Sequence, residues 1–565
     1  MRALLESHLL TVLVFLPSIA AALLLLFPER RAREAKLFAL GASVLELGLS
    51  FPLWSRFDLT TGSFQFTEKA EWIPALGISY TVGIDGISLL LVLLTTLLTP
   101  VSLLYSVTHV EKSVRVFSIA FLVLETGMIG SLVALDLALF YVFWEVMLVP
   151  MYFIIGIWGG GRRIYAAMKF FLFTMAGSLL MFLAILYLAV RHRAVTGGWS
   201  FLLADLARLT YPTMAIETVL FLAFALAFAI KVPVFPLHTW LPDAHTEAPT
   251  AGSIILAGVL LKLGVYGYLR FALPLFPDAA MRYAPWLGIL GVIGVVYGAF
   301  VAYAQKDMKR LVAYSSVSHL GLVVIGIGAF TSAAMTGSVL QMINHGLSTG
   351  ALFLLVGVLY ERSHTREIAD YGGIAGVVPV TTGLFLVATF SSIGLPGLNG
   401  FVGEFLILLG TWTSSHRWWA IAAATGVILS AIYMLSLVQR VFWNPLTREE
   451  NRRLPEIRAS ELVAAAALVI PMVWIGVRPN DFLDRLRPSV EEVRRSVAAR
   501  KAAASSSPSP RASSSLSPRA SSSLLSPRAS SSLLSSRAKR EISPRKARGS
   551  SALRAPAGQG KGASE

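Results

Sequence analysis

Long apolar runs restrict the possible folds of this chain more than any other feature of its sequence. About fourteen runs of roughly 20 apolar residues, the length of a transmembrane helix, follow one another between residues 8 and 478. Lipid offers no partners to backbone polar groups, so such runs form helices, and they are too long for barrel strands. The sequence therefore predicts an all-α, multi-pass membrane protein. The predicted spans lie near residues 8–27, 36–54, 84–106, 115–135, 137–157, 166–190, 214–238, 248–273, 281–303, 309–329, 337–360, 383–411, 418–442 and 460–478.

The two ends of the chain need separate interpretation. The run 8–27 is similar to a signal peptide at first sight, but it has no clear small-residue cleavage site and is long enough to span, so we expect a helix. Residues 501–565 repeat "SPRASSSLL"-like units that cannot bury a core, which predicts a disordered tail. This tail is either dispensable or binds anionic lipid or a partner.

Composition excludes several classes of function. The net charge of +16 is concentrated in the tail, so nucleic-acid binding explains it poorly. Because the chain has no cysteine, it cannot hold thiolate-bound iron–sulfur clusters, c-type haem or disulfides. Neither a dinucleotide fingerprint nor a Walker loop is present. We therefore expect that this chain binds no cofactor of its own and that the lipid bilayer is its surroundings.

Basic residues predict the orientation in the membrane. Lys and Arg are concentrated in the loops that follow the odd-numbered spans, for example in "ERRAREAK" and "QKDMKR". Short loops rich in Lys and Arg stay in the cytoplasm. This side is therefore predicted to be cytoplasmic, and both termini are predicted to lie on the other side.

Helix breakers interrupt two of the predicted spans. The first is "KVPVFPLHTWLP", which starts at Lys231, and the second is "SSIGLPGLNGF", residues 391–401. Each is the fourth span in a block of five, and an odd number of helices inverts the second block. Paired broken helices in an inverted repeat indicate a transport site, although a single kink is often a packing feature. The predicted organisation is 1–113 for helices 1–3, 114–275 for the first repeat, 276–443 for the second, 444–500 for the last helix and an amphipathic segment, and 501–565 for the tail.

Six titratable residues lie inside apolar runs, where charge is costly: Glu145, Lys231, Lys262, His319, His345 and Glu404. Glu145 comes nine residues after Asp136, about 14 Å along a helix, which is near the middle of the bilayer. Glu145 and Lys231 are either a structural ion pair or two members of a proton path. Burial and neighbouring charge shift the protonation of such groups, whereas a buried pair contributes little stability. The two histidines are either satisfied core residues or relays.

A polar segment, "HTWLPDAHTEAPT", follows the first broken helix and carries His238, Asp243, His245 and Glu247. One interpretation is a solvated loop. The other is the mouth of a proton uptake path on the side predicted to be cytoplasmic.

Long motifs around these residues resemble a known family, the antiporter-like subunits of respiratory complex I and of Mrp-type cation/proton antiporters. The resemblance covers about residues 75–445. Glu404 in "VGEFLIL" is similar to the M-type members. The motifs are "YTVGIDGISLLLVLLT" (80–95), "YVFWEVMLVPMYF" (141–153), "KVPVFPLHTWLPDAHTEAPTAGSIILAGVLLKLGVYG" (231–267), "DMKRLVAYSSVSHLG" (307–321) and "GLPGLNGFVGEFLIL" (394–408).

The resemblance implies two inverted five-helix repeats and a proton path. In this path Glu145 pairs with Lys231, Lys262 is central, His319 and His345 relay, and Glu404 faces the exit. It also implies an L-type and an N-type neighbour in a bacterial inner membrane. NADH, FMN, the iron–sulfur clusters and quinone would lie in other subunits, so the chain would act in an enzyme without a redox centre of its own. The family pattern does not include the tail.

The leading hypothesis is a proton-translocating membrane subunit of NADH–quinone oxidoreductase. The alternative is a cation/proton antiporter subunit of an Mrp-type or hydrogenase-linked complex, which sodium-dependent proton exchange without NADH would favour. A passive scaffold would tolerate neutral substitutes for the buried charges. A quinone-site enzyme is disfavoured because no paired polar site lies beside a redox centre.

Overall fold

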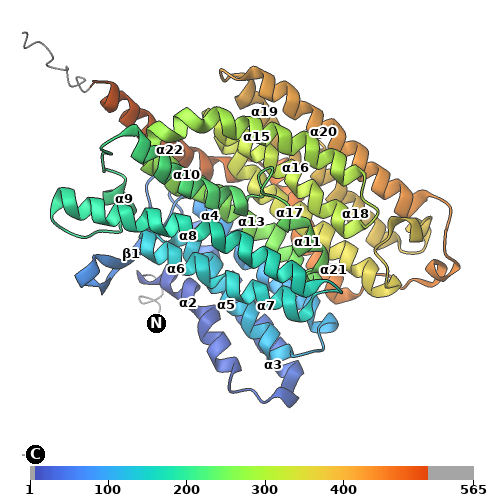
Figure 1. Ribbon diagram of the computed structural model, residues 1–565. Helices are drawn as coiled ribbons and strands as arrows, with labels where there is room; N and C mark the ends of the chain where they lie inside the picture. Colours follow the sequence, from blue (N-terminus) through green and yellow to red (C-terminus); the bar gives the residue numbers. More distant parts are fainter. Residues whose placement is uncertain (1–6, 507–565) are drawn as a thin grey trace, which may run out of the picture. The chain divides into compact units, whose positions relative to one another are not determined.

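The computed structural model describes residues 7–506, and the predicted tail beyond residue 506 lies outside them. Long helices lie side by side in this part of the chain (Figure 1). Twelve of its helices are long and apolar enough to cross a membrane. Two further predicted spans correspond to shorter apolar helices. The helix Leu9–Leu24 corresponds to the predicted span 8–27, and the helix Pro379–Ser392 forms the first part of the broken span 383–411. The predicted all-α membrane fold is confirmed.

The N-terminal part contains α2 (Leu9–Leu24), α3 (Ala32–Ser55) and α4 (Gly86–His109). Asp85 begins α4 with a capping box, in which its carboxylate accepts from the N–H of Ser88 and the Ser88 hydroxyl accepts from the N–H of Asp85. Between α3 and α4, β1 (Gln65–Ile73) and β2 (Ile78–Ile84) form an antiparallel hairpin. The sequence analysis did not predict this hairpin.

The first predicted block contains five spans, and its fourth is broken as expected. Helix α10 ends at Lys231 and α11 begins at Trp240. The Trp240 indole N–H donates to the Ile230 carbonyl at 2.9 Å, which satisfies one acceptor at the broken end. The elements are α5 (Val114–Val133), α6 (Leu137–Val146), α7 (Leu148–Trp158), α8 (Arg163–Thr196), α9 (Leu203–Leu206), α10 (Met214–Lys231), α11 (Trp240–Glu247), α12 (Thr250–Ile255), the π-helical η3 (Leu256–Leu260), α13 (Leu261–Gly267), the π-helical η4 (Tyr268–Ala272) and α14 (Leu273–Leu275).

The second block repeats this order of spans. Its fourth span breaks between Ser392 and Asn399, where Gly394 (φ +74°) and Gly397 (φ +94°) adopt the left-handed backbone that glycine tolerates. The elements are α15 (Pro277–Tyr303), α16 (Met308–Gly328), α17 (Ser332–Ser363), α18 (Pro379–Ser392), α19 (Asn399–Trp412), α20 (Arg417–Val438) and the π-helical η7 (Gln439–Trp443), with short 3₁₀ turns η5 (Ile368–Asp370) and η6 (Ile374–Gly376) between α17 and α18.

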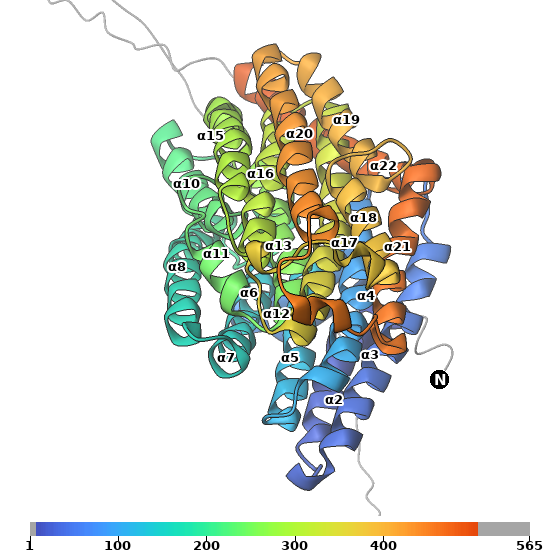
Figure 2. The same cartoon turned by 90° about the vertical axis from the view of Figure 1, so that its right-hand side faces the viewer.

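The last two helices are α21 (Ala459–Val477) and α22 (Asn480–Ser506). Helix α22 buries Leu486, Val490, Val493 and Val497 at spacings of three and four residues, which gives it one apolar face. It packs against α4 and α17. Figure 2 shows α22 near α19 and α21.

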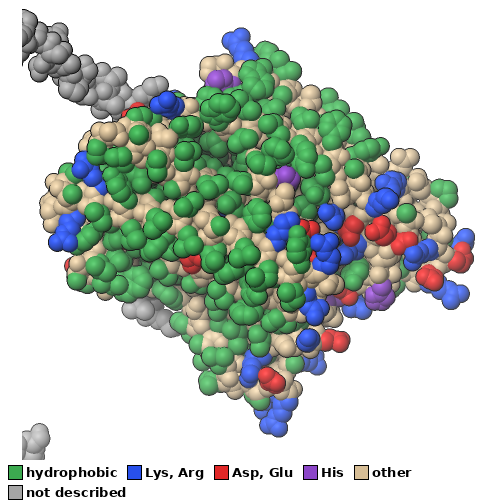
Figure 3. Space-filling view, viewed as in Figure 1, with side chains coloured by type: hydrophobic (Ala, Val, Ile, Leu, Met, Phe, Trp, Pro, Cys, Tyr) green, Lys and Arg blue, Asp and Glu red, His purple; other side chains and the backbone are tan. Residues whose placement is uncertain are grey.

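Hydrophobic side chains cover much of the surface. Figure 3 shows them spread over the face formed by α8, α10 and α15, while charged side chains gather at one margin and at the tip between α2 and α3. Large exposed apolar residues on these helices include Leu172, Leu183, Val190, Val219, Leu222 and Phe300. A contiguous apolar surface of this kind is expected of a protein that faces lipid.

Candidate functional site

Glu145 lies beside a break between α6 and α7. Pro150 has no N–H, so the carbonyl of Val146 loses its helical partner. The neighbouring hydrogen bond from the Met147 N–H to the Phe143 carbonyl is stretched to 3.4 Å. Glu145 is half-buried at this break, in the second span of the first block.

Lys231 is the last residue of α10 and is 1% exposed. Its Nζ atom has no hydrogen-bond partner among the described residues and lies 4.9 Å from the centroid of the Trp144 ring and 5.9 Å from that of Phe170. Aromatic faces stabilise cations at such distances. Glu145 is close enough to Lys231 for electrostatic interaction, but within residues 7–506 the two groups form no direct ion pair. The predicted pair therefore interacts at a distance.

Lys262 is the second residue of α13, which directly follows the π-helical η3. Single π-turns inside α-helices are frequent at functional sites. The Lys262 Nζ atom donates to the Ala257 carbonyl, within η3, and lies 2.7 Å from Nδ1 of His345. Lys262 is completely buried, so its charge depends on these two contacts.

Three residues of the second block continue from Lys262. The rings of His345 and His319 have centroids 5.8 Å apart. Nδ1 of His319 lies 3.4 Å from Oε1 of Glu404. The same Glu404 oxygen accepts from the Gln341 amide at 3.2 Å. The structure thus brings four of the six predicted residues into one buried row: Lys262, His345, His319 and Glu404.

His319 has further polar neighbours. Its Nε2 atom lies 3.3 Å from the Ser392 hydroxyl and 3.3 Å from the Tyr433 hydroxyl. Gly394 lies beside the carboxylate of Glu404, and a Cβ atom at position 394 would meet Oε2 at 2.6 Å. The break between α18 and α19 therefore makes room for the Glu404 side chain.

The polar segment after Lys231 is mostly a buried short helix, and the interpretation as a solvated loop is wrong. His238 is buried with its ring edge-on to Tyr297. Asp243 pairs with Lys169 at 2.7 Å. Glu247 accepts from the N–H of Arg162 at 2.9 Å. These contacts anchor α11 between the neighbouring spans.

His245 on α11 is a buried titratable residue that the sequence analysis placed only in the polar segment. It is completely buried and stacks on Phe353 at 4.7 Å, and neither ring nitrogen has a hydrogen-bond partner among the described residues. It is within electrostatic range of Lys262 and of Lys309. In the sequence, His245 lies in a polar segment rather than in a long apolar run, so its burial was not predictable from its neighbours.

A cavity of about 610 Å³ lies beside Lys309. It is bordered by the ends of α4, α7 and α17 and by the start of α12, and Glu247, Thr250 and Lys309 line it. These segments belong to the side predicted to be cytoplasmic. Lys309, 5% exposed, donates to the Ala248 carbonyl at the wall of this cavity.

Two buried arginines outside the row form ion pairs with buried carboxylates. Arg270 contacts Asp85 at 2.5 Å and Arg362 contacts Glu461 at 2.6 Å. Each pair joins segments far apart in the chain. Charges satisfied in this way fix helices together rather than exchange protons.

The family profile described as "NADH:quinone oxidoreductase/Mrp antiporter, TM" matches residues 134–431, which include all six predicted residues. The chain is also 47% identical over 494 residues to NADH-quinone oxidoreductase subunit M of Rhodobacter capsulatus, covering 86% of this chain and 96% of the relative. Subunit M of Rickettsia prowazekii is 42% identical, with 86% and 99% covered.

This chain belongs to the NADH:quinone oxidoreductase/Mrp antiporter family.

Solved structures of this family share the fold. A chain of respiratory complex I from Thermus thermophilus superposes with a TM-score of 0.77 and is 36% identical, with 86% of this chain and 99% of that chain covered. A chain of the Mrp complex from Dietzia gives a TM-score of 0.75 at 21% identity, covering 87% of this chain and 99% of that chain. The second likeness shows the fold alone. The M-type members of the family are therefore better matches than the Mrp type.

The sequence analysis overlooked one acidic pair in this member of the family. Glu46 on α3 and Glu125 on α5 are both completely buried, and their carboxyl groups lie against each other, beside the Thr99 hydroxyl. Within residues 7–506 neither forms an ion pair with a basic side chain. Glu125 lies in "FLVLETGMIG", so the signal that singled out Glu145 was present for it too.

Proposed function

We propose that this chain is the M-type membrane subunit of a NADH–quinone oxidoreductase and that it moves protons through the buried row of acids and bases. The observation that carries the proposal is the row Lys262, His345, His319 and Glu404, in which the first and last pairs are in polar contact and the two histidine rings lie 5.8 Å apart. Each of these side chains can accept and release a proton, and each is 6% exposed or less. In a site closed to bulk water, proton transfer needs such groups within reach of one another.

Glu145 and Lys231 act as the control element of this row. Because Lys231 has only aromatic faces and a distant carboxylate around its ammonium group, a small movement of Glu145 changes its electrostatic stabilisation strongly in a medium of low dielectric constant. Opening or closing of the break at Met147 is the movement that would couple a neighbouring subunit to Lys231.

The uptake side is proposed to be the cavity beside Lys309. From there a proton reaches Lys262 through His245, whose ring nitrogens have no hydrogen-bond partner among the described residues and which lies within electrostatic range of both lysines. The exit is proposed at Glu404. The positive-inside rule supports this direction, because the loops around the Lys309 cavity lie on the basic side.

Residues 114–275 and 276–443 are proposed to be inverted repeats. Three features recur in both: a broken fourth span, a π-helical segment at the end of the fifth span (η4 and η7), and an acid–base couple between the second and fourth spans. The couple is Glu145 and Lys231 in the first repeat and His319 and Glu404 in the second. The acid thus changes helix between the repeats.

The assembly follows from the same proposal. L-type and N-type subunits would flank this chain in a bacterial inner membrane, and NADH, FMN, the iron–sulfur clusters and quinone would lie in other subunits. The wide apolar surface leaves room for such neighbours as well as for lipid.

The test uses the assembled complex in membrane vesicles. Glu404→Ala is expected to abolish proton translocation driven by NADH, measured by quenching of a ΔpH dye, and to slow NADH–quinone turnover. Lys306→Ala, at an exposed lysine in the loop before α16, is the matched control and should pump normally. Normal pumping and turnover in Glu404→Ala would refute the proposal. Sodium-dependent proton exchange without NADH would favour the antiporter alternative.

A further inference from the structure

An apolar groove of about 480 Å³ lies where the turn of the β-hairpin meets α6 and α8 (Figure 1). Every residue that lines it is aliphatic or aromatic. Along α8 the groove extends from Phe182 to Val190, which are eight residues or about 12 Å of helix apart. Several of the lining side chains are exposed, so the groove is accessible from the surface of the chain. The exposed lining residues are Trp72, Ile73, Leu76, Val142, Leu186 and Val190.

Packed backbone and aromatic rings hold the groove in shape. Gly77, in the turn of the hairpin, has φ +65°, and a Cβ atom at this position would lie 2.9 Å from the Cβ atom of Trp199. Deeper along α8, the rings of Tyr141 and Phe182 stack with their centroids 4.7 Å apart. Tryptophan is enriched at the level of the lipid headgroups. With Trp72 and Trp199 at one end and Phe182 at the other, the groove runs from that level towards the hydrocarbon region.

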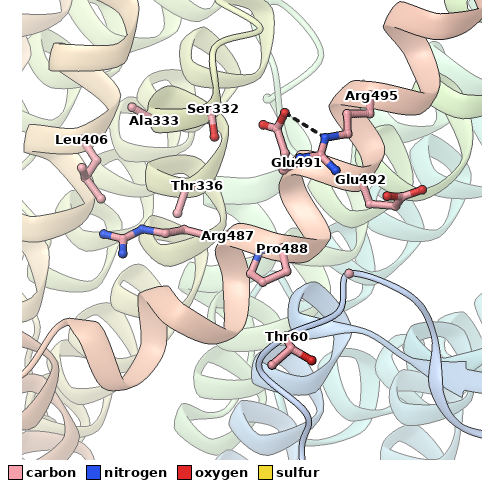
Figure 4. A pocket seen from close by; sticks show the side chains of 11 residues that line it. Thr60, Ser332, Ala333, Thr336, Leu406, Arg487, Pro488, Glu491, Glu492 and Arg495 are labelled. Carbon is pink, nitrogen blue, oxygen red and sulfur yellow. Dashed lines mark ion pairs between the residues drawn. The ribbon is translucent and has the colours of Figure 1, made fainter.

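The larger cavity in Figure 4 has a different chemistry. It has a volume of about 610 Å³ and lies between the start of α17, the middle of α19 and α22. Its walls carry Arg487, Glu491 and Arg495, and the last two form an ion pair at 3.4 Å. Ionised groups are costly to bury against hydrocarbon, so that cavity suits water. The groove beside the hairpin has no charged residue in its walls, and it suits an acyl chain.

Basic residues lie at the end of the groove. Arg191, His192 and Arg193 follow one another in the last turns of α8. Arg193 comes four residues after Ala189, which lines the groove, so the two lie on the same face of α8. The guanidinium carbon of Arg193 is 4.7 Å from the centroid of the Trp199 ring. The Nε atom of Arg191 is buried without a hydrogen-bond partner, and within residues 7–506 neither arginine forms an ion pair with a carboxylate.

The position of these arginines in the membrane is unusual. Helix α8 is the sixth span, so its end lies on the side predicted to be extracytoplasmic, where short loops carry few basic residues. Two arginines that no carboxylate neutralises have room there for an anionic partner. Phosphate is such a partner, because guanidinium groups bind it through charge-assisted hydrogen bonds. A phosphate beside a groove that suits an acyl chain matches the structure of a phospholipid.

We propose that this groove binds an acyl chain of an anionic phospholipid and that Arg193, together with Arg191, binds its phosphate group. Removal of the acyl chain from other lipid gains little by itself, so the arginines supply the selection for negative net charge over a zwitterionic headgroup. The bound lipid fills the space between the hairpin turn and α8. None of these residues belongs to the buried row, and the inference therefore goes beyond the proposed function.

The test uses photoactivatable lipids and the assembled complex. The complex is reconstituted into vesicles of phosphatidylethanolamine and phosphatidylglycerol that contain a trace of a probe lipid with a diazirine on its acyl chain. The probe is either phosphatidylglycerol or phosphatidylcholine, and adducts are located by peptide mass spectrometry after irradiation. We expect adducts on the hairpin turn and on residues 182–190. The phosphatidylglycerol probe should exceed the phosphatidylcholine probe by about fivefold, which is the factor that one basic side chain near a membrane surface contributes.

Four variants separate the headgroup from the groove. Arg193→Gln should lower the adduct yield of phosphatidylglycerol to nearly that of phosphatidylcholine. Arg208→Gln, at an exposed arginine after α9 on the same side of the membrane, should leave the yield unchanged. Leu186→Trp places a larger ring in the groove and should lower the yields of both probes. Leu183→Trp, at an exposed position on the same helix but outside the groove, should lower neither.

Two results would overturn the inference. Equal yields of the two probes in the unmodified complex would mean that only ordinary surrounding lipid is present. Adducts elsewhere on α8 but none in the groove would mean that a neighbouring chain covers it. Because the comparison of the two probes needs no variant, it stays decisive if Arg193→Gln does not assemble. The proposed function is tested separately, since normal pumping by Glu404→Ala would refute that function and leave the lipid adducts unchanged.

Discussion

The Nζ atom of Lys262 lies 2.7 Å from Nδ1 of His345, and this contact connects the fifth span of the first block to the third span of the second. It is the only place in the buried row where the two blocks exchange a hydrogen bond between titratable side chains, among the described residues. A change in the protonation of either side chain therefore changes the electrostatic energy of its partner in the other block. In the proposed proton path, this contact is the junction between the two blocks.

Replacing Lys262 by methionine tests this junction. Methionine has nearly the same length and no titratable group, so the packing is kept while the relay is interrupted. We expect NADH-driven proton translocation to fall by about tenfold or more, measured in vesicles with equal amounts of assembled complex. Lys306→Met at the exposed loop is the control, and a Lys262→Met complex that pumps at the control rate would contradict the prediction.

Gly394→Ala should damage the Glu404 site through the backbone. Alanine in the left-handed region costs about 1–2 kcal/mol, and its Cβ would lie 2.6 Å from Oε2 of Glu404. We expect a lower apparent Tm of the purified complex and slower translocation. Gly383→Ala lies in the exposed face of α18 with no atom within 4 Å of the new Cβ, so it should keep or raise the Tm. Equal behaviour of the two variants would speak against a role for the break.

Glu456 predicts a pH dependence of stability outside the membrane. Although burial raises its pKa, hydrogen bonds from the Thr381 hydroxyl and the N–H groups of Ile457, Val380 and Thr381 outweigh burial and lower the pKa below its ordinary value of 4.5. A carboxyl group with a lowered pKa stabilises the fold above its unfolded pKa, and this stability is lost as pH falls through the folded pKa.

The Tm of Glu456→Gln should therefore be lower than that of the unmodified protein at pH 7, and the difference should shrink as the pH falls below about 4. The exposed Glu450→Gln is the control and should show no such trend. A difference in Tm that stays constant with pH would show that Glu456 acts through packing alone.

The acidic pair on α3 and α5 gives a contrast between two buried glutamates. Glu46 faces Glu125 without a basic partner, so Glu46→Gln replaces a buried acid that no cation compensates and should leave the Tm unchanged or raised. Glu461 instead pairs with Arg362 at 2.6 Å and with His109 at 3.2 Å. Breaking such a buried pair costs about 3–5 kcal/mol, so Glu461→Gln should lower the Tm clearly. Destabilisation by Glu46→Gln of the same size would refute this contrast.

The sequence predicted those features that are costly inside a lipid bilayer, namely helix breakers and charged residues within apolar runs. Prolines and glycines inside apolar runs located both broken spans, and the cost of charge in lipid singled out Lys262 and Glu404. Contacts that depend on tertiary packing were not predictable. The indole of Trp144 under Lys231 is one example, because it depends on how α6 crosses α10. The π-helical turn that frees the Ala257 carbonyl is another, since its sequence is ordinary helix-forming residues.

The close approach of α22 to the first third of the chain bears on how the chain completes its folding. Position 62 lies against the Pro488 carbonyl and position 86 against the Arg485 carbonyl, both glycines without room for a Cβ atom. The early spans can therefore make these contacts with α22 only after α22 has been synthesised. A nascent chain arrested before residue 480 would present an unfinished docking face to quality-control proteases.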